Sequence, residues 1–266
     1  MSSLMSGISK VCDSSLRNNS GEFFALDDGI ATLLIMISIV IPTYNESENI
    51  LELLSGLRRA LEGAKIHDYE LVVMDDDSPD GTFNMVNAMK DSSIRCVNRR
   101  GKKRGLANAV IDGFSEAKGD ILGVMDSDLS HPPAVVPAMI SSVMTGTNLV
   151  VGSRYVKGGG TADWPLKRRI ISYLACRAAA SLTKIKDATS GFFFFKKAIL
   201  DNVSLNPSGF KIGLEIFVKA DHRGNIAELP YVFTDRRMGK SKFGLKAIFS
   251  YLKQMIELYG YKRRQS

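Results

Sequence analysis

Two aspartates one residue apart follow a short apolar segment near the middle of the chain. The segment Ile121–Met125 is typical of a buried strand, and Asp126 and Asp128 come at its end. Because alternate residues of an extended chain point to the same side, both carboxylates can reach one cation. A hard divalent ion such as Mg²⁺ or Mn²⁺ takes carboxylate, carbonyl and phosphate oxygens as ligands. Taken alone, Asp-Ser-Asp is more typical of a surface turn, so the rest of the chain must decide.

Two further loops that carry carboxylates also follow predicted strands. One contains Glu46, and the other runs from Asp75 to Asp80. Loops that follow parallel strands gather at one edge of a sheet, so we expect these acids to converge with Asp126 and Asp128. Clustered carboxylates repel one another unless a cation is present. The chain has no GxxxxGK[ST] loop, so the sequence predicts that a metal ion and basic side chains bind phosphate.

Length and composition suit one large α/β domain or two small ones. The chain has 266 residues, 45% of them hydrophobic, and a formal charge of +7, which favours anionic partners. Nucleic acid is excluded as a partner because it does not account for the acidic loops. The cysteines, Cys12, Cys96 and Cys176, have the spacing of neither a disulfide framework nor a zinc site. They are expected to be reduced thiols in a cytosol-facing protein.

Strands and helices alternate along the chain, which predicts an α/β fold with a mostly parallel, helix-covered sheet. The longest apolar stretch near the start, Leu33 to Ile41, is too short for the ~20 residues of a membrane span. We expect a mobile tail over 1–32, a catalytic domain over 33–243 and an amphipathic helix with a basic end over 244–266. The expected strands are Leu34–Ile41 (ended by Pro42), Glu70–Met74, Ile94–Val97, Ile121–Met125, Asn148–Gly152, Phe192–Phe195 and Ala227–Phe233. The helices expected after residue 130 are Ala134–Met144, Leu166–Leu182, Ile212–Ala220 and Leu245–Tyr259.

Six motifs in order give the chain a family resemblance. They are PTYNE at 42–46, DDDSPDGT at 75–82, GLANAVIDGF at 105–114, DSDLSHPP at 126–133, GSRY at 152–155 and RMGKSK at 237–242. Together they resemble the family-2 glycosyltransferases and, more narrowly, the polyprenol-phosphate (dolichol-phosphate) mannosyltransferases. The resemblance implies a Rossmann-like GT-A fold, GDP-mannose as donor, a divalent metal ion (magnesium or manganese), and transfer of mannose to a lipid phosphate with inversion.

The resemblance also implies roles for individual residues. Those expected to hold the nucleoside are Pro42, Tyr44, Glu46, Val73 and Asp75. Those expected to bind the metal are Asp126, Asp128 and Ser130, with Ser127 beside them in place of the usual Ala. Those expected to meet the acceptor phosphate are Arg154, Arg168 and Ser172, and those near the donor diphosphate are Lys211, Arg236 and Lys242. Of all these, Asp128, Arg154 and Arg236 are expected to be catalytic.

The expected partners follow from this chemistry. A phosphate monoester has a second pKa of about 6 and is already a dianion at neutral pH, so the acceptor needs no strong general base. The polyprenyl chain lies in a bilayer, which predicts peripheral contact with the cytoplasmic face of a membrane, made directly or through a separate membrane subunit. The docking face is expected to carry Arg154, Arg168 and Arg169 beside the last helix. Two alternatives stay open: a UDP-glucose:polyprenyl-phosphate glucosyltransferase and a non-catalytic nucleotide-sugar-binding subunit.

Several aromatic features allow two interpretations. His131 either takes part in catalysis or shapes the loop of the aspartate pair, and the sequence favours the second. Phe192–Phe195 either lines a lipid path or forms a buried strand, and four consecutive aromatics favour the strand. Trp164 suits a membrane interface and internal packing equally well.

Overall fold

The computed structural model describes residues 24–27, 30–33, 35–162, 164–206, 211–220, 225–235 and 245–265. The chain divides into two units, Met1–Ile35 and Met36–Ser266. In the first unit, β1 (Phe24–Asp27) and β2 (Ile30–Leu33) pair as an antiparallel hairpin. This hairpin lies in the segment that was expected to be a tail, and residues 1–23 of that segment lie outside the described residues.

The second unit is built on a seven-stranded sheet with the order β10-β7-β9-β6-β3-β4-β5. All neighbours pair in parallel except β9, which runs antiparallel to both β6 and β7. The mostly parallel sheet predicted from the sequence is therefore confirmed. Its strands are β3 (Ile37–Thr43), β4 (Tyr69–Asp75), β5 (Ile94–Asn98), β6 (Ile121–Val124), β7 (Leu149–Ser153), β9 (Phe193–Lys196) and β10 (Ile226–Pro230). A short parallel pair, β8 (Gly160–Thr161) and β11 (Val232–Phe233), completes the strands.

The central strand β3 runs through Pro42, where the sequence predicted it to end. Proline lacks an N–H group and is usually excluded from central strands. Here the pairing of β3 with β6 stops at Val40, opposite Val124, whereas the pairing with β4 continues to Thr43. The strand is therefore one-sided at Pro42, and a residue without a donor is tolerated there.

Phe193–Phe195 of the phenylalanine run lie in the antiparallel strand β9 inside the sheet, and Phe192 directly precedes it. All four residues, Phe192–Phe195, are fully buried, which confirms the strand interpretation. A Cβ atom added to Gly123 of β6 would overlap the ring of Phe194 on the adjacent strand. Glycine at this position therefore allows a bulky aromatic strand to lie next to β6.

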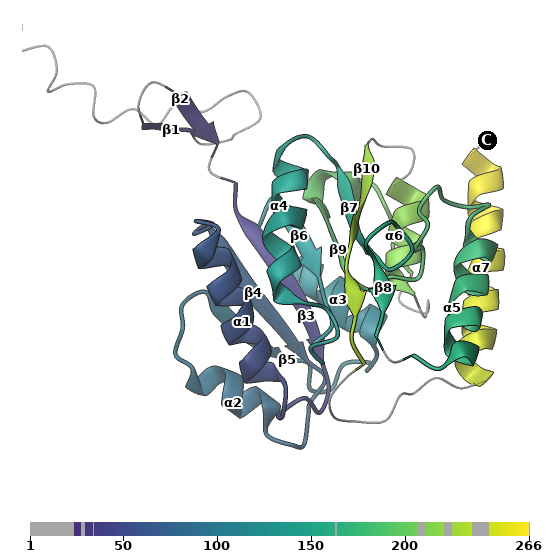
Figure 1. Cartoon of the computed structure of the whole chain (residues 1–266). Helices are drawn as coiled ribbons and strands as arrows, with labels where there is room; N and C mark the ends of the chain where they lie inside the picture. Colours follow the sequence, from purple (N-terminus) through teal and green to yellow (C-terminus); the bar gives the residue numbers. More distant parts are fainter. Residues whose placement is uncertain are drawn as a thin grey trace, which may run out of the picture. The chain divides into compact units, whose positions relative to one another are not determined.

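Helices cover both faces of the sheet (Figure 1). On one face, α3 packs Ala107, Val110 and Phe114 against Val40 and Val72 of the sheet. On the other face lie α1, whose apolar residues recur at helical spacing and are buried, and α4. The bounds of these helices and of the shorter α2 are α1 (Ile50–Gly63), α2 (Thr82–Ala88), α3 (Leu106–Glu116) and α4 (Val136–Met144). A 3₁₀ turn at Pro133–Val135 precedes α4.

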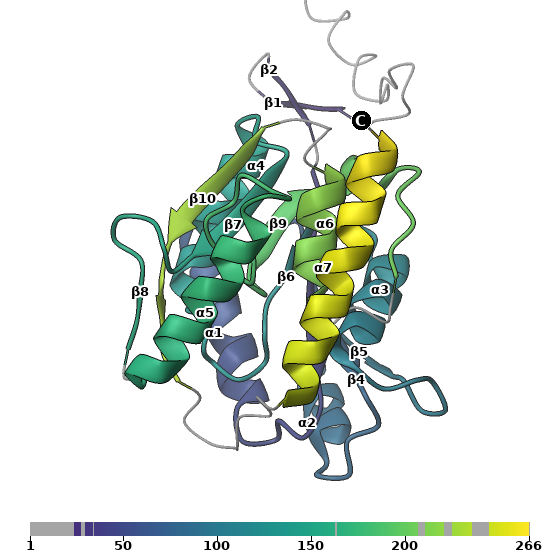
Figure 2. The same cartoon turned by 90° about the vertical axis from the view of Figure 1, so that its right-hand side faces the viewer.

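Three later helices lie together on one side of the unit (Figure 2): α5 (Leu166–Ala179), α6 (Ile212–Ala220) and α7 (Leu245–Gln265). Leu214 and Val218 of α6 share an apolar cluster with Met255 and Leu258 of α7. The Tyr251 hydroxyl of α7 donates to the Ala175 carbonyl of α5 at 2.7 Å. None of the helices in the described ranges is both long and apolar enough to span a bilayer.

Candidate active site

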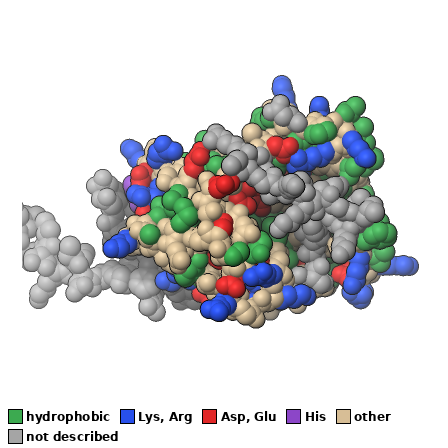
Figure 3. All heavy atoms as spheres, turned by 90° about the horizontal axis from the view of Figure 1, so that it is seen from below, with side chains coloured by type: hydrophobic (Ala, Val, Ile, Leu, Met, Phe, Trp, Pro, Cys, Tyr) green, Lys and Arg blue, Asp and Glu red, His purple; other side chains and the backbone are tan. Residues whose placement is uncertain are grey.

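The loops that follow β3, β4 and β6 meet at one edge of the sheet because these strands are neighbours. Ser127, after β6, donates from Oγ to the Pro42 carbonyl at 3.2 Å. The Asn45 amide, after β3, donates to the Ser78 hydroxyl at 3.0 Å. The convergence predicted from the sequence is thus confirmed. Figure 3 views this side of the molecule, where acidic side chains reach the surface near the middle.

The aspartate pair begins directly after β6. The Asp126 side chain is 34% exposed, whereas Asp128 is 4% exposed. Oδ1 of Asp128 accepts a hydrogen bond from the Ser130 hydroxyl at 2.5 Å and one from the Ser130 amide at 3.1 Å. Between them, Leu129 has φ +62°, a left-handed conformation that is rare for a branched residue and is typical of functional loops. The loop therefore gathers Asp128 and Ser130 oxygens beside the more accessible Asp126.

This set of groups fits a hard divalent cation that shares its ligands with a substrate. The donors are two carboxylates and one hydroxyl, all oxygen, which is the preference of Mg²⁺ and Mn²⁺. In the part of the chain that the structure describes, no three His, Cys, Asp or Glu side chains group as a metal site. A metal ion held by Asp126 and Asp128 would take further oxygens from a bound diphosphate, which is usual for Mg²⁺.

His131 anchors this loop. Its Nδ1 accepts a 3.0 Å hydrogen bond from the Asp126 amide, and its ring stacks on Phe192 with centroids 4.8 Å apart. The side chain is 1% exposed, and burial lowers the pKa of His131 although Asp126 and Asp128 oppose this. Nδ1 acts as an acceptor and not as a donor, and the contacts of the ring agree with the loop-shaping interpretation.

The residues predicted to hold the nucleoside lie around the ends of β3 and β4. Pro42 and Val73 are strand residues, while Tyr44 and Glu46 are half-buried in the loop after β3. Asp75 is fully buried, and its carboxylate accepts from the amide and the hydroxyl of Ser78 at 2.8 and 2.6 Å. It therefore shapes the turn after β4.

Arg104 adds a cation that the sequence analysis did not single out. Its guanidinium carbon lies 5.1 Å from the centre of the Tyr44 ring, and Nη2 donates to the Asp77 carbonyl at 3.2 Å. Arg104 comes from the basic loop between β5 and α3, so only the fold shows that it reaches Tyr44.

Lys211 directly precedes α6, close enough to Asp126 for their charges to interact. Its ammonium donates to the Thr189 carbonyl at 3.1 Å. Gln254 of α7 binds its main chain on both sides, accepting from its N–H at 3.0 Å and donating to its carbonyl at 2.8 Å. Burial, with the charge of Arg154, lowers the pKa of Lys211 below its ordinary value, and the carboxylates of Asp126 and Asp187 offset this only in part.

Arg154 is a buried residue, 9% exposed, so its expected place on an exposed docking face is wrong. It follows β7, and its guanidinium donates to Asp187 from Nε at 2.7 Å and from Nη2 at 2.6 Å. Burial acts to lower the pKa of Arg154, but the hydrogen bonds and charge of Asp187 outweigh it and raise that pKa well above its ordinary value. Its charge is therefore balanced inside the protein.

Arg168 and Ser172 lie on α5, next to Arg154. Arg168 donates from Nη1 to Asp235 at 2.5 Å, and its guanidinium carbon lies 3.9 Å from the Trp164 ring centre. Trp164 is 9% exposed and donates from Nε1 to Asp235 at 3.1 Å, which favours the packing interpretation. Ser172 accepts a 2.8 Å hydrogen bond from the Tyr155 hydroxyl.

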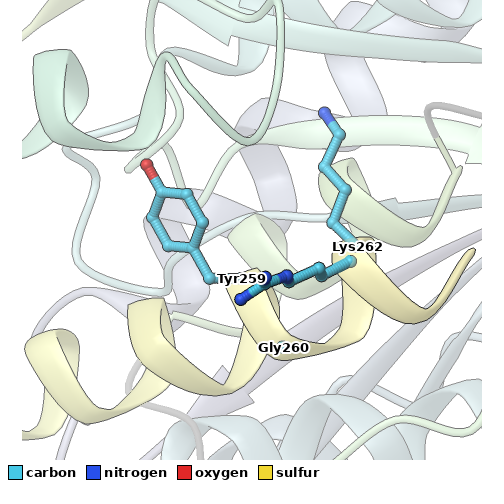
Figure 4. A pocket seen from close by; sticks show the side chains of 4 residues that line it. Tyr259, Gly260 and Lys262 are labelled. Carbon is cyan, nitrogen blue, oxygen red and sulfur yellow. The ribbon is translucent and has the colours of Figure 1, made fainter. Parts of the chain in front are cut away.

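Two predicted site residues, Arg236 and Lys242, lie outside the described residues. Their roles stay predictions. A pocket on α7, lined by Tyr259, Gly260, Lys262 and Arg263, shares no residue with the site described above (Figure 4).

Comparisons with known proteins agree with this geometry. The model of the glycosyl transferase family 2 matches residues 38–204. A dolichol-phosphate mannosyltransferase from Pyrococcus furiosus is 44% identical over 226 residues, which cover 84% of this chain and 63% of that protein. One from Saccharomyces cerevisiae is 39% identical over 238 residues, covering 86% and 88%. The chain therefore spans less than two thirds of the Pyrococcus relative and most of the yeast one.

The fold has counterparts among solved structures. A glucosyl-3-phosphoglycerate synthase from Mycobacterium tuberculosis, crystallised with Mn²⁺, uridine diphosphate and phosphoglyceric acid, superposes with a TM-score of 0.64 at 22% identity. The match covers 85% of this chain and 77% of that one, and it shows the GT-A fold. With the sequence relatives and the strand-end carboxylates, it follows that this chain belongs to glycosyl transferase family 2, among the dolichol-phosphate mannosyltransferases.

Proposed function

We infer that this protein transfers mannose from GDP-mannose to the phosphate of a dolichyl or other polyprenyl phosphate. The observation that carries this proposal is the pair Asp126 and Asp128 at the end of β6, in a chain whose relatives bear that activity in their names. The pair lies beside the loops after β3 and β4, which is where a nucleotide binds in open α/β sheets.

The reaction exchanges one bond to the sugar for another. An oxygen of the acceptor phosphate attacks the anomeric carbon of mannose and forms the new C–O bond. The bond from that carbon to the β-phosphate oxygen breaks, and GDP leaves with the electron pair. Attack from the opposite side inverts the anomeric centre. The acceptor is a dianion above a pH of about 6, so no side chain has to remove a proton.

A divalent metal ion is proposed to assist departure of the GDP leaving group. Asp126 and Asp128 would hold it, with Ser130 beside them, and the similar mycobacterial structure contains Mn²⁺. Such an ion neutralises the charge that develops on a departing diphosphate. Lys211, close enough to Asp126 for their charges to interact, supplies a second cation. Arg236 and Lys242 are proposed to act there as well.

The donor nucleoside is proposed to lie against Pro42, Tyr44, Glu46, Val73 and Asp75. Tyr44 offers an aromatic face and Arg104 a cation at that face. On the other side of the aspartate pair, Arg154, Arg168 and Ser172 are proposed to receive the acceptor phosphate, because an arginine fork binds two phosphate oxygens at once.

Two helices next to the acceptor residues expose apolar side chains toward solvent. We name this set the α5–α7 apolar surface: Leu166, Ile170, Tyr173 and Leu174 of α5, and Phe249, Leu252, Ile256 and Tyr259 of α7. Basic residues lie along it, including Arg169 and Lys253. An apolar surface bordered by cations suits the interface of an anionic membrane. This surface is proposed to bring the site to the lipid acceptor on the cytoplasmic leaflet, directly or beside a membrane subunit.

The test offers the purified protein labelled GDP-mannose or UDP-glucose, with a polyprenyl phosphate and Mn²⁺. Mannosyl lipid is the expected product, and isothermal titration is expected to show tighter binding of GDP-mannose. Glucosyl lipid would make the protein a glucosyltransferase. Tight nucleotide binding without transfer of either sugar would make it a non-catalytic binding subunit.

A further inference from the structure

Asp187 is a buried carboxylate outside the set that the sequence singled out. It lies between α5 and β9 and is fully buried. Its Oδ2 accepts from the amide and Nε of Arg154 at 2.9 and 2.7 Å, and Oδ1 accepts from Nη2 at 2.6 Å. The main chain of Asp187 is fixed in turn, since its amide donates to Glu228 of β10 at 3.0 Å.

The segment 187–191 contacts three charged groups of the site. The Thr189 hydroxyl accepts from Nη2 of Arg154 at 3.0 Å, and the Thr189 carbonyl accepts from the Lys211 ammonium at 3.1 Å. At its end, a Cβ atom on Gly191 would lie 3.5 Å from Oδ1 of Asp126. One short segment therefore links the acceptor-side arginine, the donor-side lysine and the metal-side carboxylate.

The hydrogen bonds divide the Arg154 guanidinium into two edges. Asp187 takes the edge formed by Nε and Nη2 as a bidentate partner. Such pairs fix the plane of a guanidinium, and a buried arginine needs a partner to remain charged. The Nη1 edge is then held in one orientation.

We propose that Asp187 is a positioning residue for the acceptor: it holds Arg154 so that the Nη1 edge faces the lipid phosphate. This rests on the proposed function, in which Arg154 receives that phosphate. Asp187 itself contacts neither the sugar nor the phosphate, and it acts through Arg154.

The test measures binding of farnesyl monophosphate, a short polyprenyl phosphate, by isothermal titration, so it needs no turnover. Asp187→Asn is expected to weaken this binding by about tenfold or more, as expected when one partner of a buried charge pair is lost. Binding of GDP with Mn²⁺ should weaken less than binding of farnesyl monophosphate, because Asp187 acts on Lys211 through its charge but holds Arg154 by direct hydrogen bonds. In transfer assays, the same variant should raise KM for the acceptor more than KM for the donor.

A double-mutant cycle separates positioning from general destabilisation. Arg154→Gln alone and Arg154→Gln with Asp187→Asn should bind farnesyl monophosphate equally weakly, because without the guanidinium Asp187 has nothing to position. The double variant leaves no unpaired buried charge, so weak binding by this variant in its folded state shows that loss of folding is not the cause. Asp112→Asn is the matched control: it removes one carboxylate partner of the buried Arg99 and should leave acceptor binding unchanged.

Each outcome decides the assignment. The positioning role of Asp187 would be overturned if Asp187→Asn bound farnesyl monophosphate with wild-type affinity. Additive losses of affinity from Arg154→Gln and Asp187→Asn in the double-mutant cycle would overturn it as well. If wild type binds farnesyl monophosphate but uses UDP-glucose, the proposed donor fails and the role of Asp187 stands. If wild type does not bind farnesyl monophosphate at all, the acceptor site and the role of Asp187 both fall.

Discussion

The main-chain N–H of Asp126 donates a 3.0 Å hydrogen bond to Nδ1 of His131. This bond closes the loop of the aspartate pair on a ring that is held between Phe192 on one face and the edges of Tyr231 and Phe233. The position of Asp126 therefore depends on its own strand and also on an aromatic cluster formed by Phe192 just before β9, Tyr231 between β10 and β11, and Phe233 of β11.

This dependence predicts the effect of replacing His131. His131→Phe keeps the stacked ring but leaves the buried amide of Asp126 without its acceptor, which costs about 1–3 kcal/mol. His131→Asn offers Oδ1 near the position of Nδ1. We expect lower stability and transfer activity in the Phe variant and partial recovery of both in the Asn variant, measured by thermal unfolding and by mannosyl-lipid formation. If both variants were as active as wild type, the hydrogen bond between Asp126 and His131 would not contribute to activity.

The metal proposal predicts separate effects on folding and on activity. Asp128→Asn should remain folded, because the amide oxygen still accepts from Ser130, but it loses the charge that a divalent ion requires. Transfer should fall at least about a hundredfold, the scale for losing an electrostatic group of a transition state. Asp201→Asn, on the surface, serves as the control. Full activity of the wild type in excess chelator would contradict a metal-dependent reaction.

The thiols of Cys96 and Cys176 are expected to react slowly with alkylating agents in the folded protein. Burial, with the nearby charge of Asp75, raises the pKa of Cys96 to about 12, and burial, with Asp187, raises that of Cys176 to about 11. Thiolate is the reactive form, and a raised pKa leaves less of it in the folded than in the unfolded chain. At pH 8, iodoacetamide should label both slowly in the native protein and quickly in urea, as peptide mass spectrometry would show. If the native protein were labelled as fast as the protein in urea, this expectation would be refuted.

The arrangement of the strand-end acids could be predicted from the sequence because it depends on local patterns. Apolar segments that end at Asp75 and Asp126 indicate strands, and the alternation with helices indicates that they are parallel. The antiparallel direction of the strand that contains Phe193–Phe195 could not be predicted, because it depends on which strands it pairs with, β6 and β7, and these pairings are set by the whole fold.

The partners of charged residues were the part that the sequence could not supply. Arg154 and Asp187 form a pair across 33 positions, and neither residue type nor spacing points to the other. Of the arginines expected on the docking face, Arg154 is buried against Asp187, while Arg169 is exposed. The docking face itself stays a prediction. The segment Asp-Ala-Thr-Ser-Gly at 187–191 reads as an ordinary turn until the fold places it beside Asp126.

The α5–α7 apolar surface predicts how the protein meets a membrane. Ile256 of α7 is 73% exposed, so Ile256→Glu should change stability by less than about 0.5 kcal/mol. It replaces an apolar contact worth up to about 1.5–3 kcal/mol on full burial with a charge that anionic lipid repels.

Flotation with anionic liposomes should recover wild type at low salt and much less at high salt, because screening acts within about 8–10 Å. Ile256→Glu should be recovered poorly. Met144→Glu on α4, where Met144 is also exposed in wild type, at 50%, should behave as wild type. Equal recovery of wild type with neutral and with anionic liposomes would show that electrostatic attraction does not contribute to membrane binding. If Ile256→Glu floats with anionic liposomes as well as wild type does, the membrane contact lies outside the α5–α7 apolar surface. If neither wild type nor any variant floats with liposomes, anchoring is assigned to a separate subunit.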